Sequence, residues 1–155
     1  MRMVFLIAAA AALWVTAPIA KAAESINGVW RLESQEVDGE KASAEPMTLK
    51  VTQTGDKFLF AFSVPVNKIY FVSMSYTVRM DGSEGDVLNS HGEKVGTVQM
   101  SAAGPSKYRL ILRSSNRRPS NILISVSADG KALTSESDAI QAGRPVHSKQ
   151  VFARY

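Results

Sequence analysis

The chain has 155 residues, of which 18 are basic, 14 are acidic and none is cysteine. Without cysteine, disulfides, zinc–thiolate sites and thiol nucleophiles are excluded. The formal net charge of +4 is too small to favour a nucleic acid as partner, because nucleic-acid binding requires a strongly basic surface.

The first 22 residues have the layout of a secretory signal peptide. Arg2 precedes an apolar run from Met3 to Val15, and Ala20-Lys21-Ala22 has the small-x-small pattern of a cleavage site. The run is shorter than the roughly 20 residues that a membrane-spanning helix requires. We therefore expect residues 1–22 to be removed on export. Residues 23–155 are expected to form one domain that is not membrane-spanning and is soluble in the periplasm or secreted.

Along residues 23–155, turn signals recur at the short intervals that are typical of an all-β domain. Asp38-Gly39, Asp81-Gly82 and Asp129-Gly130 are examples, because these dipeptides supply the positive φ that tight hairpins need. The segments between the turns alternate apolar and polar residues, and none has good helical periodicity. This pattern predicts an antiparallel up-and-down β-barrel of 8–10 strands. Residues 83–89 carry the weakest strand pattern, and the sequence leaves strand and loop open there.

Gly28-Val29-Trp30 stands at the start of the first expected strand. This Gly-x-Trp resembles the first signature of the lipocalins and their calycin superfamily. The stretches GVWRLES, SYTVRMDG, SADGKALT and AGRPVHSKQVFARY make most of residues 23–155 similar to small exported bacterial lipocalin-like proteins. The second lipocalin signature, Thr-Asp-x-x-Tyr, is not recognisable. The resemblance implies a lipocalin-like barrel that Trp30 closes at one end, with Gly28 allowing the preceding turn and Arg154, or else Arg144, beside the indole.

Rows of alternating large apolar residues are the candidates for the inner wall of this barrel. Such rows run through residues 57–64, 69–79 and 107–114. Small barrels either hold one small ligand or are filled by side chains, and the sequence leaves both possibilities open. The expected lining of the calyx is Phe58, Phe60, Phe62, Tyr70, Met74, Tyr76 and Leu110.

The sequence contains no recognisable catalytic or metal-binding pattern. Its two histidines, His91 and His147, do not form an HxH or HxxxH pair, and no nucleophile motif accompanies them. The carboxylates Glu33, Glu36 and Asp138 are scattered over separate segments, so they do not indicate a paired acid and base. We therefore expect neither an enzyme, nor a metal site, nor a cofactor.

Arg117 and Arg118 stand at an expected hairpin tip, in the stretch RSSNRRPSN. Two interpretations are open: contact with an anionic headgroup or ligand carboxylate at the barrel mouth, or an ordinary soluble turn, which we favour. The function that the sequence favours is non-catalytic binding of a small hydrophobic or amphipathic ligand in the calyx. The alternative is a filled barrel that binds a protein partner, as an inhibitor or accessory protein.

Overall fold

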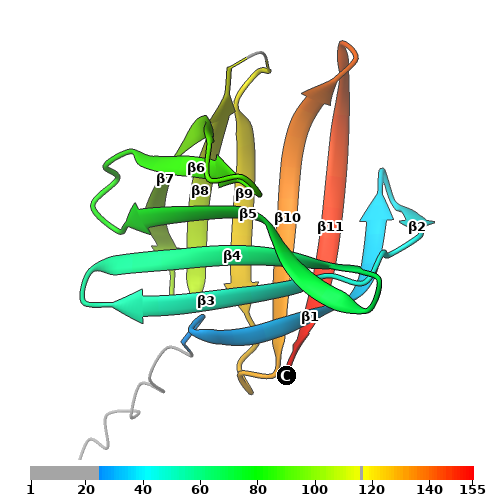
Figure 1. Cartoon of the computed structure of the whole chain (residues 1–155), viewed down its shortest axis with the longest axis horizontal. Helices are drawn as coiled ribbons and strands as arrows, with labels where there is room; N and C mark the ends of the chain where they lie inside the picture. Colours follow the sequence, from blue (N-terminus) through cyan, green and yellow to red (C-terminus); the bar gives the residue numbers. More distant parts are fainter. Residues whose placement is uncertain (1–24, 116) are drawn as a thin grey trace, which may run out of the picture.

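The computed structural model describes residues 25–115 and 117–155, so the expected signal peptide lies outside the described residues (Figure 1). These residues form eleven strands and no helix. The strands are β1 (Gly28–Val37), β2 (Glu40–Ala42), β3 (Thr48–Thr54), β4 (Lys57–Val66), β5 (Ile69–Arg79), β6 (Gly85–Asn89), β7 (Lys94–Gly104), β8 (Lys107–Ser114), β9 (Ser120–Val126), β10 (Ala132–Gln141) and β11 (Arg144–Arg154).

The strands form a single closed antiparallel barrel. Sequential strands pair from β3 through to β11, β1 pairs with β3, and the pairing of β1 with β11 closes the ring. The three-residue β2 pairs only with β1, so ten strands make up the ring. Figure 1 shows β1, β3, β4 and β5 crossing steeply over β9, β10 and β11. The expected all-β up-and-down barrel is confirmed, and the weak segment 83–89 contains a strand, β6.

The inner wall of the barrel has two halves of different character. The half where β1 begins and β11 ends, which we call the closed half, holds most of the fully buried side chains, among them Trp30, Leu133 and Phe152. The other half leads to the β4–β5, β8–β9 and β10–β11 connections, and we call it the open half. The buried core consists of Ile26, Trp30, Leu32, Leu49, Val51, Phe58, Phe60, Tyr76, Val78, Val87, Val98, Met100, Leu110, Ile124, Val126, Leu133 and Phe152.

A β-bulge in β5 divides a row of residues that the sequence predicts on one face. Phe62 pairs with Met74, whereas its neighbour Ser63 pairs with Val72, so Ser73 is the extra residue. An extra residue shifts the alternation by one position. Met74 therefore faces inward with the buried Tyr76, but Tyr70 faces outward and is 50% exposed. The expected place of Tyr70 in the inner lining is wrong, because simple alternation does not anticipate a bulge.

Candidate functional site

At the closed end of the barrel, an arginine packs over a buried tryptophan and binds three backbone carbonyl groups. The Arg154 guanidinium lies 4.2 Å from the centre of the Trp30 ring system and donates hydrogen bonds to the carbonyl oxygens of Gly130, Asn27 and Ser25. Trp30 is fully buried, and its Nε1 donates to the Ile26 carbonyl at 2.9 Å. These contacts join the N-terminal segment, the β9–β10 turn and the last strand, so this end is sealed.

Gly28 is required by the same arrangement. Its φ is +148°, and a Cβ placed on it would lie 2.7 Å from Nη1 of Arg154. A side chain at this position would be strained and would displace the arginine from the indole. Arg144, the other arginine considered from the sequence, lies exposed at the start of β11 and has no part in this closure.

Four of the residues expected to line a calyx lie instead in the packed interior of the closed half. Phe58, Phe60, Tyr76 and Leu110 are all buried, and the rings of Phe60 and Tyr76 stack with centroids 4.9 Å apart. Burial raises the pKa of Tyr76 far above its ordinary value, so this phenol stays neutral at any physiological pH. The row therefore forms the floor of the open half.

In the open half, the apolar part of the inner wall is only half-buried. Phe62 and Met74, which pair with each other, face inward above the floor, together with Leu112 and Ile122. The inward direction follows from the register, because paired residues share a face. Leu112 and Ile122 were not singled out in the sequence, although they continue the alternation of Leu110 and Ile124.

Polar side chains occupy the middle of the inner face of β1, β10 and β11 in the same half, and the apolar Val37, Ala139 and Val146 lie next to them toward the rim. Gln35 and Ser135 both pair with Gln150, and Ser137 pairs with Ser148. All five side chains are half-buried, and in the described part of the chain none takes part in a hydrogen bond. β10 is directly opposite β5 in the order of strands around the ring, so this polar row faces the wall that carries Met74. The sequence reading missed this row, although serine and glutamine at every second position in SESDAIQ and HSKQ are its signal.

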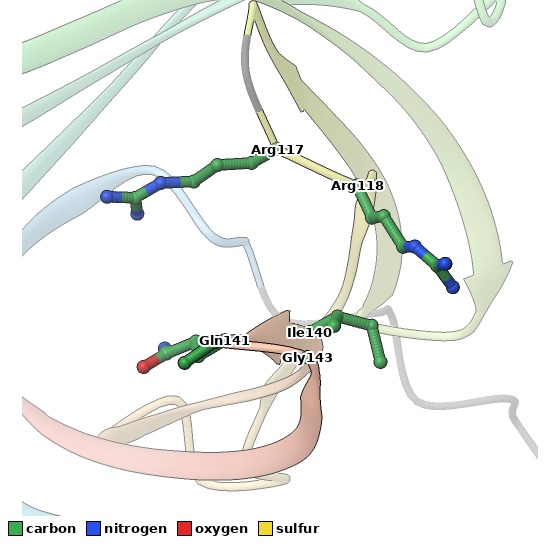
Figure 2. A pocket seen from close by; sticks show the side chains of 6 residues that line it. Arg117, Arg118, Ile140, Gln141 and Gly143 are labelled. Carbon is green, nitrogen blue, oxygen red and sulfur yellow. The ribbon is translucent and has the colours of Figure 1, made fainter.

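A cleft of about 510 Å³ lies at the rim of the open half. It is bounded by Arg117 and Arg118 of the β8–β9 connection and by residues 140–143 of the β10–β11 hairpin. Figure 2 shows that Arg117 extends on the side of Gln141, whose position in β10 faces inward, while Arg118 extends on the side of Ile140, which faces outward. One arginine therefore lies on the mouth side of the rim, and the other lies on the outer side.

The titratable groups that contact one another lie outside the barrel interior. His147 Nδ1 is 2.8 Å from Asp138 Oδ1, on outward-facing positions of β11 and β10. The hydrogen bond to the Asp138 carboxylate raises the pKa of His147 above its ordinary value. His91 lies in an exposed turn, near the Ser90 hydroxyl. Among residues 25–115 and 117–155, no group of three or more histidines and carboxylates is arranged to hold a metal ion.

Comparison with known proteins places the fold. No family model matches the chain, and no curated protein matches it in sequence. Among solved structures, it is similar to zebrafish ileal bile acid-binding protein complexed with cholic acid, with a TM-score of 0.58 and 20% sequence identity over 83% of this chain and 98% of that one. The likeness is one of fold, and it agrees with the closed antiparallel barrel described above. In the part of the chain that is described, no helix is long and apolar enough to cross a membrane.

Proposed function

We propose that the protein binds a small hydrophobic or amphipathic molecule in the open half of its barrel, without catalysing a reaction. The observation that carries the proposal is the divided inner wall above the packed floor. The apolar side chains of Phe62, Met74, Leu112 and Ile122 lie on one part of the wall. The row of serines and glutamines, which has no hydrogen-bond partner among residues 25–115 and 117–155, lies on the other. Such a wall suits a ligand with an apolar body and polar groups.

The polar row and the rim cleft recognise different groups of the ligand. Hydroxyl and amide groups that lack a protein partner donate and accept hydrogen bonds to neutral polar groups of a ligand. Arg117, on the mouth side of the rim cleft, is placed to pair with an anionic group at the entrance. Support comes also from the neighbour of similar fold, which was solved with cholic acid bound. We further propose that the protein acts in a bacterial periplasm or after secretion, which rests on the signal-peptide pattern of residues 1–22.

Ligand binding is tested with 1-anilinonaphthalene-8-sulfonate, a fluorescent amphiphile that has an apolar body and one anionic group. The variants are Met74→Glu, which places a negative charge on the inner wall, and the matched control Ser75→Glu, one residue along β5 on the outer face. We expect the probe to bind the wild type and Ser75→Glu alike, and to bind Met74→Glu at least about tenfold more weakly, since a carboxylate on the wall disfavours apolar burial and repels the sulfonate. Equal binding to all three would place the probe outside the barrel and contradict the proposal.

The natural ligand is sought by native mass spectrometry of the protein exported through its own leader and recovered from the periplasm. An additional mass that organic solvent removes would identify the ligand class. A bare polypeptide that also fails to bind an added panel of lipids would refute ligand carriage. It would favour instead the filled barrel that binds a protein partner.

A further inference from the structure

The exposed apolar side chains of the molecule are concentrated on one hairpin. Eight large hydrophobic residues are exposed in the described part of the chain; six of them lie on β4 and β5, and five of these six gather at the tip of the β4–β5 hairpin. Ile69 is 61% exposed and Phe71 is 52% exposed, which is unusual for residues of this size within a strand. Contiguous exposed apolar surface of this kind marks an interaction site. The five residues are Val66, Ile69, Tyr70, Phe71 and Val72.

Both faces of this hairpin are apolar. Ile69 pairs with Val66, and these two lie on the same face as Phe71, whereas Tyr70 and Val72 lie on the opposite face. Asn67 and Lys68, both with positive φ, form the two-residue turn at its tip. A flat protein surface covers only one face of a hairpin. The boundary between lipid headgroups and acyl chains surrounds both faces, and it also accepts aromatic rings and a tip lysine.

Two cations continue the same surface along the outside of the barrel, and no described ion pair includes either of them. Arg31 and Lys50 face outward on β1 and β3, in two cross-strand rows that reach β5 and contain no aspartate or glutamate. A groove of about 360 Å³ between them is lined by Tyr70 and by Tyr155, whose ring lies 4.3 Å from the Arg31 guanidinium carbon. Apolar side chains next to unpaired cations are the combination that binds anionic bilayers.

We propose that the β4–β5 hairpin, with Arg31 and Lys50 beside it, docks the protein onto the surface of an anionic phospholipid bilayer. The hairpin inserts Ile69 and Phe71 to the depth of the headgroups, and the two cations contact lipid phosphates. The hairpin tip borders the open half and the two cations lie on the outside of the closed half, so docking lays this side of the barrel against the membrane and brings one part of the rim to it. Tyr70 and Val72 face outward, whereas Val66, Ile69 and Phe71 continue the inward-facing row of Phe62 to the exposed tip of the hairpin. The inference rests on the exposure of this tip, and it stands whether or not the barrel carries a ligand.

The docking surface is tested by flotation of the protein, without its leader, with vesicles of phosphatidylcholine alone or of phosphatidylcholine mixed with phosphatidylglycerol. Ile69→Ser is compared with Val95→Ser, because Val95 is an exposed β-branched residue on β7, away from the hairpin. We expect the wild type to prefer the anionic vesicles. Ile69→Ser is expected to lose about tenfold in partitioning, while Val95→Ser behaves like the wild type.

A reporter variant makes the outcome independent of the flotation assay. In Phe71→Trp, the new indole is expected to shift its emission to the blue when anionic vesicles are added, whereas the buried Trp30 of the wild type shows no shift. Arg31→Gln with Lys50→Gln is expected to remove the preference for phosphatidylglycerol. The proposal is overturned if the wild type binds neither kind of vesicle, or if Ile69→Ser and Val95→Ser partition alike. It is also overturned if the indole of Phe71→Trp does not shift its emission when anionic vesicles are added. Circular dichroism of each variant confirms that it is folded.

Discussion

The closed and open halves of the barrel are built from the same strands, yet their inner faces are chemically different. Along β10, the buried Leu133 is followed inward by Ser135 and Ser137, and along β11, the buried Phe152 is preceded by Gln150 and Ser148. The inner face of each strand thus changes from apolar to polar midway along its length, and Ala139 paired with Val146 follows the polar residues toward the rim. The difference indicates that the packed closed half stabilises the fold. The open half contributes less to stability and is available to bind a ligand.

The largest effect is expected from Trp30→Ala in the closed half. The change removes a fully buried indole and leaves a cavity, so the free energy of unfolding should fall by about 3–5 kcal/mol. Phe62→Ala is the control in the open half, and it should cost only about 1 kcal/mol because Phe62 is half-buried. Urea denaturation measures both. Equal losses would remove the distinction between the two halves.

A smaller effect is expected when the arginine that closes the barrel is replaced. Arg154→Leu deletes three hydrogen bonds to carbonyl oxygens and the contact with the indole, so about 2 kcal/mol of stability should be lost. Arg144→Leu, at the exposed start of the same strand, should change stability by no more than about 0.5 kcal/mol. Comparison of their urea midpoints distinguishes closure by Arg154 from a general effect of removing positive charge from β11.

In the open half, removal of a polar group should have little effect on stability. Ser137→Val changes a half-buried side chain that makes no hydrogen bond to any described residue, and we expect the free energy of unfolding to stay within about 0.5 kcal/mol of the wild-type value. The same variant should weaken binding of an amphipathic ligand with hydroxyl groups. A large loss of stability would show that Ser137 takes part in packing, and the polar row would then be structural.

The smallest effect is a pH dependence that belongs to the outer surface. The pKa of His147 is raised in the folded state by the Asp138 carboxylate, so this pair stabilises the fold below the ordinary histidine pKa. The contribution is lost as pH rises through the raised value. Thermal unfolding of His147→Gln should therefore show a lower melting temperature than the wild type at about pH 5 and no difference at about pH 9. A difference that is larger at high pH would contradict the assignment.

Sequence reasoning was most successful where one rule determines the structure. Turn dipeptides and alternation predict the closed antiparallel barrel, and the Gly-x-Trp at Gly28 and Trp30 indicates where its first strand begins. Alternation alone could not locate the bulge at Ser73, because nothing in IYFVSMSYTVR distinguishes an extra residue, and so Tyr70 was placed on the wrong face. Nor does alternation give depth along the barrel axis. Phe60 and Phe62 look equivalent in the sequence, yet one lies in the floor and the other lies above it.

The most direct test of the division between the halves is the reactivity of single thiols, because the natural chain has no cysteine. Ser137→Cys places a thiol on the inner wall of the open half, and Met100→Cys places one on the fully buried inner wall of the closed half. With 5,5′-dithiobis(2-nitrobenzoate), we predict rapid reaction of native Ser137→Cys, and reaction of Met100→Cys only as the protein unfolds. If both thiols were protected alike, the barrel would be packed from end to end, and the account of an accessible open half would be contradicted.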